Sequence, residues 1–215
     1  MMINWLFSYL FFLVAFVSCS GSEQFSETSD QKHTGAIQIE RIINPFPVVD
    51  QKGDTISHPF IGGFNVPRPQ FTDIDGDGDP DLFVQENSDE MIFLENKTNS
   101  NGESYLEWQT NRFMNLSINE WFRFVDMDQD GDYDLLAEQP YSYIKYYRND
   151  GTAENPEFNL VADTLKDTAG EPIFSDRQNI PNVTDIDCNN KLDLFIGRLD
   201  GTVMRYESTG LDEND

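Results

Sequence analysis

Residues 71–84 read Phe71-Thr72-Asp73-Ile74-Asp75-Gly76-Asp77-Gly78-Asp79-Pro80-Asp81-Leu82-Phe83-Val84, and this segment sets the architecture of the chain. Two further segments share its pattern: Phe124-Val125-Asp126-Met127-Asp128-Gln129-Asp130-Gly131-Asp132-Tyr133-Asp134-Leu135-Leu136-Ala137 and Val183-Thr184-Asp185-Ile186-Asp187-Cys188-Asn189-Asn190-Lys191-Leu192-Asp193-Leu194-Phe195-Ile196. The first aspartates of successive copies are 53 and 59 residues apart. Self-similarity at such a period indicates a repeat architecture.

The similarity continues beyond the acidic segments. Equivalent positions downstream hold Leu94, Tyr147 and Tyr206, and then Asn96, Asn149 and Ser208. Upstream, Asn44-Pro45-Phe46 and Asn155-Pro156-Glu157-Phe158 mark equivalent module starts. We therefore predict a repeat region over residues 36–215 with modules at about 44–100, 104–152 and 155–210, preceded by an extra strand at 37–43.

The elements expected in these modules are short strands. Val48-Val49 and Thr55-Ile56 flank a turn sequence, which indicates a hairpin. The apolar runs after the acidic segments are typical of buried strands bounded by turns. Further strands are expected at 91–95, 143–148 and 202–207, and no helix of ten residues is expected after residue 18. About four strands per module predict an all-β fold of β-propeller-type blades.

The acidic segments have the chemistry of a metal-binding loop. The pattern places oxygen side chains at positions 1, 3, 5 and 9 and a main-chain carbonyl at position 7, and calcium takes six to eight oxygen ligands. Position 6 requires a left-handed backbone, which suits Gly78 and Gly131 and is tolerated by Asn190. An EF-hand is excluded, because position 12 is Val84, Ala137 or Ile196 instead of a bidentate Glu.

The loop, the Phe two residues before it and the apolar strand after it resemble FG-GAP repeats, also described as VCBS repeats. The resemblance covers about residues 44–210 and implies propeller blades with up to three calcium ions on one face. It implies the following side-chain ligands: Asp73, Asp75, Asp77 and Asp81; Asp126, Asp128, Asp130 and Asp134; Asp185, Asp187, Asn189 and Asp193. Main-chain oxygens would come from Asp79, Asp132 and Lys191. The third loop, with Asn189 and Lys191, is expected to bind calcium most weakly.

The number of modules departs from the resemblance. Closed propellers have about four to eight blades, whereas this chain has three modules, so a partial or open propeller is expected. Three explanations stay open: the chain is a fragment of a longer propeller, it associates with copies of itself to complete the ring, or it forms an open array.

The N-terminal residues predict export. Trp5–Val17 is apolar except for Ser8, and it is too short to span a membrane but suits the core of a signal peptide over residues 1–18. Phe16-Val17-Ser18-Cys19 resembles a bacterial lipobox, which implies a lipid on Cys19 and a membrane anchor, followed by a polar tether to residue 35. The expected location is the bacterial cell envelope, as an outer-membrane lipoprotein or at the cell surface.

Charge and motifs narrow the classes of function. The formal net charge of −25 disfavours nucleic acid, which needs basic patches. Cys19 and Cys188 are the only cysteines, so a disulfide framework is excluded. No common catalytic motif occurs, and we predict no catalytic residues and no enzyme.

The expected function is a calcium-binding scaffold at the cell surface, for adhesion or for binding an unidentified protein or polysaccharide. Its alternative is a calcium-dependent enzyme, or a fragment of one, that degrades extracellular polysaccharide. Five aromatic residues are candidates for ligand contact or for the core between blades: Trp108, Trp121, Tyr141, Tyr143 and Tyr147.

Overall fold

The computed structural model describes residues 42, 45–56, 58–60, 62–176 and 179–209. The chain divides into two compact units, residues 1–42 and 43–215, and the second unit is the subject here. The signal peptide, Cys19 and the tether lie outside the described residues, as does nearly all of the predicted strand at 37–43.

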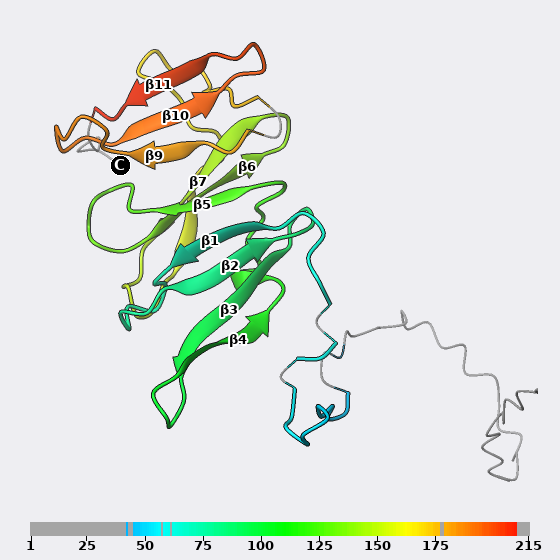
Figure 1. Ribbon diagram of the computed structural model, residues 1–215. Helices are drawn as coiled ribbons and strands as arrows, with labels where there is room; N and C mark the ends of the chain where they lie inside the picture. Colours follow the sequence, from blue (N-terminus) through cyan, green and yellow to red (C-terminus); the bar gives the residue numbers. More distant parts are fainter. Residues whose placement is uncertain (1–41, 43–44, 57, 61, 177–178, 210–215) are drawn as a thin grey trace, which may run out of the picture. The chain divides into compact units, whose positions relative to one another are not determined.

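Eleven strands form three antiparallel sheets in the described ranges (Figure 1). The first sheet contains β1 (Arg68–Thr72), β2 (Asp81–Gln85), β3 (Met91–Thr98) and β4 (Ser104–Thr110), in that order. The second contains β5 (Phe122–Val125), β6 (Asp134–Gln139), β7 (Tyr143–Asn149) and β8 (Phe158–Ala162). The third contains β9 (Asn182–Thr184), β10 (Asp193–Gly197) and β11 (Val203–Glu207). The all-β prediction is confirmed, and the sheets do not close into a propeller.

The remaining described elements are small. The 3-10 turn η1 (Phe113–Asn115) is the one helical element in these ranges. No helix among the described residues is long and apolar enough to cross a membrane. The predicted early hairpin is present as a tight turn, in which Val49 pairs with Thr55 and the Ile56 N–H donates to the Val48 carbonyl at 2.8 Å. The third sheet has three strands in the described range, one fewer than predicted.

The sheets are offset from the predicted sequence modules by one strand. β4 pairs with β3 in the first sheet, although Ser104 was placed at the start of the second module. β8 pairs with β7 in the second sheet, although Phe158 was placed in the third module. A strand pairs with the neighbour that it can reach through a hairpin, and the connections between β3 and β4 and between β7 and β8 are short enough to allow this.

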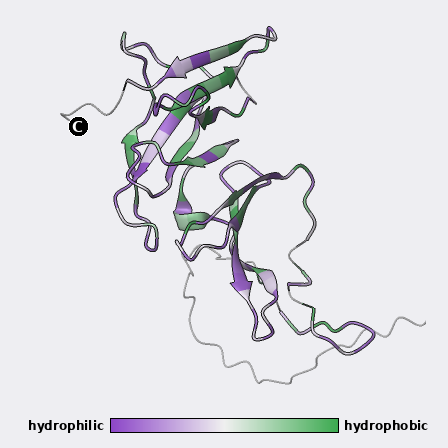
Figure 2. Cartoon of the chain, turned by 60° about the vertical axis from the view of Figure 1, so that its left-hand side comes forward, coloured by the Kyte–Doolittle hydropathy of each residue, from purple (hydrophilic) through white to green (hydrophobic). Residues whose placement is uncertain are grey.

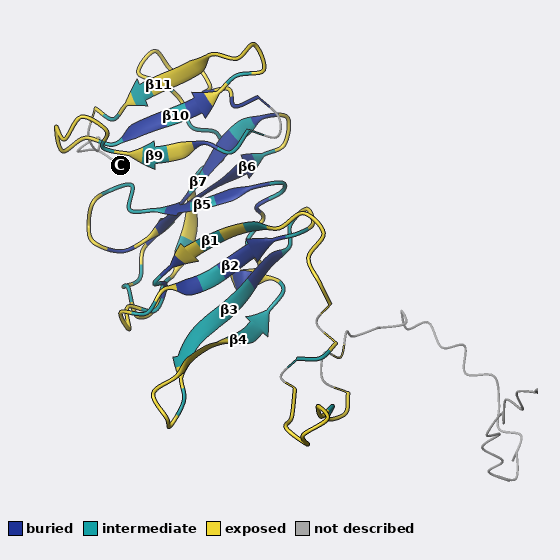
Figure 3. Cartoon of the chain, viewed as in Figure 1, coloured by how far each residue is buried: buried dark blue, intermediate teal, exposed yellow. Residues whose placement is uncertain are grey.

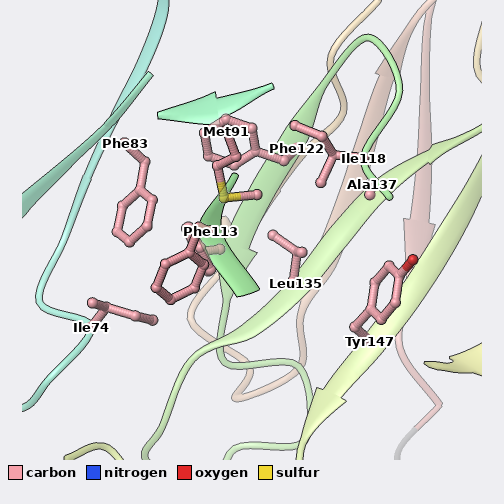
Figure 4. Close-up of a cluster of buried hydrophobic side chains, with 10 residues drawn as sticks. Ile74, Phe83, Met91, Phe113, Ile118, Phe122, Leu135, Ala137 and Tyr147 are labelled. Atoms are coloured by element: carbon pink, nitrogen blue, oxygen red, sulfur yellow. The ribbon is translucent and has the colours of Figure 1, made fainter. Parts of the chain in front are cut away.

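Two apolar clusters lie between neighbouring sheets. The first joins residues of the first and second sheets around Phe83, Phe124 and Leu135 (Figure 4). The second joins the second and third sheets around Trp121, Leu136 and Leu194. Alternate residues of β6 and β7 in the second sheet enter opposite clusters, as the period of two in a strand requires. Leu135 and Leu136, for example, belong to different clusters.

Burial falls from the inner to the outer strands (Figure 3). β2, β6 and β10 are largely buried, β4 is partly buried to exposed, and β11 is largely exposed. Hydrophobic residues lie mainly in the strands, and the connecting loops are mainly hydrophilic (Figure 2). Polar bonds also join the sheets, since the Gln70 amide donates to the Phe124 carbonyl at 2.9 Å and accepts the Phe124 N–H at 3.1 Å.

Candidate metal centre

Each acidic segment connects the first and second strands of its sheet. We name these connections loop 1 (residues 73–81), loop 2 (126–134) and loop 3 (185–193). Because all three occupy the same connection, they lie at the equivalent end of each sheet. The turns between the second and third strands lie at the opposite end, since successive antiparallel strands reverse direction.

The loops bring carboxylates together. In loop 1, oxygens of Asp73, Asp75 and Asp77 lie within 4.8 Å of one another, and in loop 2 those of Asp126, Asp128 and Asp130 do the same. The group in loop 3 consists of Asp185, Asp187 and Asp193. Clustered carboxylate oxygens at this spacing are the donors that a hard divalent cation takes. All three loops therefore hold acidic groups that can bind a metal ion.

The last aspartate of each loop fastens the loop to the sheet. Asp134 is fully buried, and its oxygens accept the N–H groups of Met127 at 3.0 Å and Asn149 at 2.8 Å. Asp81 accepts those of Ile74 at 3.3 Å and Asn96 at 2.8 Å. These residues were predicted as ligands, and the structure shows that they also close hydrogen bonds between loop and strand.

Burial and mutual repulsion disfavour the ionised form of several aspartates in loops 1 and 2. Desolvation raises the pKa of Asp81 to about 6 in spite of its hydrogen bonds. Desolvation, followed by repulsion from Asp130, Asp134 and Asp128, raises the pKa of Asp132 to about 6. The pKa values of Asp75 and Asp128 are raised as well, first by desolvation and then by neighbouring aspartates. A bound cation would remove this repulsion.

Two oxygens in these loops lack any partner. The described residues contain three buried side-chain oxygens without a hydrogen bond, and two of them are Asp73 Oδ1 and Asp132 Oδ1. Both residues line a cavity of about 310 Å³ between loops 1 and 2. A buried carboxylate oxygen without a donor is unfavourable unless a cation satisfies it. Loops 1 and 2 therefore fit a metal ion.

Asp132 plays a different part from the one expected. It was predicted to offer only its main-chain oxygen, whereas its side chain is 9% exposed and has the unpartnered Oδ1. Asp132 lines the cavity that also contains Asp73 and Gly76 of loop 1, and the spacing of residues along the chain held no signal for this position.

The left-handed backbone expected at position 6 is present in all three loops, with φ of 93° at Gly78, 102° at Gly131 and 63° at Asn190. Position 4 is also left-handed, at Gly76, Gln129 and Cys188, with φ of 70°, 63° and 58°. This second requirement was missed, because only loop 1 has glycine there.

Loop 3 differs from the other two in its surroundings. The Arg205 guanidinium donates to Asp193 Oδ1 at 2.7 Å and to Asp187 Oδ2 at 2.6 Å, so it holds two of the three grouped carboxylates. The hydrogen bond from Arg205 lowers the pKa of Asp193, in contrast with the raised pKa of Asp81 at the equivalent position.

The aromatic residues singled out by the sequence separate into buried and exposed groups. Trp121 and Tyr147 are buried in the two clusters, and Trp108 is partly buried with its indole N–H donating to Asn111 at 2.8 Å. Tyr143 packs edge-on against Phe174. Tyr141 is 89% exposed.

The sheets and loops define a class of protein: β-propeller-type repeat proteins with acidic loops that can hold metal ions. Residues 73–137 match the family described as the FG-GAP-like repeat, which confirms the predicted resemblance for this part of the chain. The match begins at the first aspartate of loop 1 and ends in β6, so it includes loops 1 and 2. Searches of curated proteins and of solved structures found no match to the chain.

Proposed function

We propose that the protein is an exported, surface-anchored scaffold whose FG-GAP-type loops bind calcium and whose folded sheets present a binding surface for a protein or polysaccharide. The observation that carries the calcium part is the set of carboxylates within 4.8 Å of one another, together with the unpartnered buried oxygens of Asp73 and Asp132.

Calcium suits these loops better than magnesium. Its larger coordination sphere accepts several carboxylate and carbonyl oxygens from one flexible loop, whereas magnesium keeps more of its waters. Extracellular modules often bind calcium with a Kd of about 10⁻⁴ to 10⁻³ M. An ion in loop 1 would join carboxylates of the loop that precedes β2, and so would stabilise the folded chain by mass action.

The binding surface that we propose lies at the opposite end of the sheets from the loops. Tyr141 in the β6–β7 turn is 89% exposed and has φ of 74°, an uncommon conformation for a bulky residue. Nearby, the Arg198 guanidinium lies 5.1 Å from the centre of the Phe174 ring, which also contacts Tyr143. Exposed aromatic and arginine side chains are common in recognition surfaces. This group therefore supports direct contact between these side chains and a protein or polysaccharide, without a bound metal ion.

Membrane attachment through a lipid on Cys19 belongs to the same proposal and rests on the sequence of residues 16–19. Replacing Cys19 by Ser should move the protein from the membrane fraction to the soluble fraction of exporting bacterial cells. Retention in the membrane would contradict the lipid anchor. The absence of catalytic activity stays a prediction.

A thermal melt tests the calcium scaffold directly. The chain from Ser22 onward should melt at a clearly higher temperature in millimolar calcium than in chelator, and the difference should disappear when Asp73 and Asp126 are both replaced by Ala. Asp54→Ala, which changes an exposed carboxylate in the turn between Val49 and Thr55, is the control. An equal midpoint with and without calcium would contradict the proposal.

A further inference from the structure

The three sheets have a different residue at one equivalent position of their third strand. Phe93 pairs with Phe83 in the first sheet, Tyr146 with Leu136 in the second, and Arg205 with Phe195 in the third. Each stands twelve residues after the last aspartate of its loop. The position therefore offers a hydroxyl to loop 2 and a permanent cation to loop 3, whereas in the first sheet it holds an apolar ring.

The contacts follow these side chains. Phe93 stacks on Phe83 with ring centres 4.8 Å apart. The Tyr146 hydroxyl donates to Asp134 Oδ2 at 2.9 Å, which adds no charge to loop 2. Arg205 instead bridges Asp187 and Asp193, positions 3 and 9 of loop 3, through two charge-assisted bonds of 2.6 and 2.7 Å.

Other polar groups of loop 3 are also engaged. The Asn189 amide donates to Glu207 Oε2 at 3.0 Å, and Lys191 Nζ lies 3.2 Å from Glu207 Oε1. No buried oxygen without a partner occurs in loop 3, where every residue is described, in contrast to Asp73 and Asp132 in loops 1 and 2. Calcium in loop 3 would have to displace a guanidinium that stays protonated at any ordinary pH and repels it strongly at this distance.

We propose that Arg205 is the resident cation of loop 3, so that the chain binds two calcium ions and holds its third loop together without metal. The inference rests on the proposed calcium binding by loops 1 and 2, and it corrects the expectation of up to three ions. Arg205 neutralises and bridges the carboxylates of loop 3, as we propose that calcium does in the other two loops.

Counting bound calcium tests this inference. Equilibrium dialysis of the purified protein should give two ions per chain. Arg205→Tyr, which installs the residue of the second sheet, should raise the count to three, and Tyr146→Arg should lower it to one. Arg148→Gln is the matched control, because it removes a guanidinium near loop 2 that pairs with Asp150 at 2.6 Å rather than with a loop carboxylate. This variant should keep two ions.

The outcomes separate the two proposals. Three ions on the unchanged protein, or two on Arg205→Tyr, would overturn the role of Arg205 and leave calcium binding intact. No bound ion on any variant would overturn the proposed function itself. If Arg205→Tyr does not fold, the count on Tyr146→Arg still decides whether an arginine at this position excludes the ion.

A second inference comes from the faces of the sheets. A Phe stands two residues before loop 1 and before loop 2. Before loop 2 it is Phe124, which is 5% exposed and packs against the first sheet. Before loop 1 it is Phe71, which is 62% exposed. Leu82 and Leu94 are partly buried on the same face of the first sheet as Phe71, while their equivalents Leu135 and Tyr147 are buried. Among the described residues, the loop end of this face, at Phe71, Leu82 and Leu94, is thus not fully covered, whereas Val84 and Ile92 farther along the same face are buried.

The third sheet shows the complementary feature. The second residue of loop 1, Ile74, packs against the second sheet and is 4% exposed. The second residue of loop 3, Ile186, is 60% exposed. Phe195, equivalent to the buried Phe83, is only partly buried. The chain therefore presents one half of the repeated sheet-to-sheet interface on its first sheet and the other half on its third.

From the continuity of this interface we infer that the occupant of both faces is a second copy of the chain. The Ile186 and Phe195 face of one copy would pack on the Phe71 face of the other, and a two-fold axis would close three sheets and three sheets into a ring of six. Six lies within the range of about four to eight blades of closed propellers, and each copy would contribute the same pair of surfaces.

The oligomeric state in calcium tests this second inference. Light scattering after gel filtration should give twice the mass of one chain, and Phe71→Asp should give the single mass. Leu199→Asp, which changes an apolar residue that is 80% exposed in the β10–β11 turn, should remain a dimer. A single mass for the unchanged protein, or an open-ended series of larger species, would overturn the inference.

Discussion

Asp134 Oδ1 accepts the backbone N–H of Asn149 at 2.8 Å, and so the end of loop 2 is joined to the end of β7. The carboxylate is completely buried and has two further donors, the Met127 N–H and the Tyr146 hydroxyl. The residue that closes the metal loop is thus also part of the sheet's own hydrogen bonding, and it has this role before any ion is bound.

Replacing Asp134 by Ala should therefore destabilise the protein even in the absence of calcium. Two backbone N–H groups would lose their acceptor, and each unsatisfied buried group costs about 1–3 kcal/mol. Chemical denaturation in chelator measures this loss. Asp130→Ala, at an exposed position of the same loop, should lower calcium binding with little effect in chelator. Equal stability of the two variants in chelator would contradict the double role.

The calcium-free protein should lose stability as the pH rises from about 4 to about 6. The pKa values of Asp81 and Asp132 are raised from 3.8 to about 6 in the folded state, so the folded state binds more protons than the unfolded state in this interval. The free energy of unfolding then falls with increasing pH. Below about pH 4 the lowered pKa of Asp193 has the opposite effect, because the contribution of Asp193 to stability is lost as the pH falls.

Melting temperatures in calcium-free buffer across this range provide the measurement. Calcium should reduce this loss of stability as the pH rises toward about 6, because the ion takes the place of the protons that the carboxylates release. A calcium-free melting temperature that rises steadily between pH 4 and 6 would contradict the prediction.

Gln129→Gly should stabilise the protein. Gln129 has φ of 63°, and a left-handed residue other than glycine costs about 1–2 kcal/mol. The greater freedom of glycine in the unfolded chain costs about 0.5–1 kcal/mol, so a net gain of about 0.5–1 kcal/mol is expected. Denaturation in chelator measures it. Gly131→Ala, at φ of 102°, should instead lose about 1 kcal/mol or more. A loss on Gln129→Gly would show that its side chain contributes more than the strain costs.

Removing calcium should affect the sheets unequally. If calcium binds as proposed, loops 1 and 2 would lose the ion that compensates their aspartates, whereas loop 3 would keep Arg205. Hydrogen exchange in chelator should therefore speed up in residues 73–81 and 126–134 and change little in residues 185–193. A matching experiment on Arg205→Tyr should extend the acceleration to loop 3. Uniform acceleration in the unchanged protein would contradict a metal-independent third loop.

Much of the candidate site could be predicted from the spacing of aspartates and apolar residues along the chain. Alternate aspartates followed by a short apolar run predicted a curled acidic loop and a buried strand, because both are properties of neighbouring residues along the chain. The left-handed backbone at Gly78, Gly131 and Asn190 followed from the same local reasoning. The sheet to which β4 belongs was predicted less well, since strand pairing depends on which neighbour a strand reaches in space.

The sequence by itself determined the three acidic loops, the strand after each loop and the repeat that relates them, because each depends on residues a few positions apart. The tertiary structure alone decided which charges meet those loops. It brought Arg205 from β11 to Asp187 and Asp193 in loop 3, and it placed Asp132 at a cavity that residues of loops 1 and 2 line together. Electrostatic energy depends on distance in space and on burial, and both are set only when strands far apart in the chain pair and sheets pack.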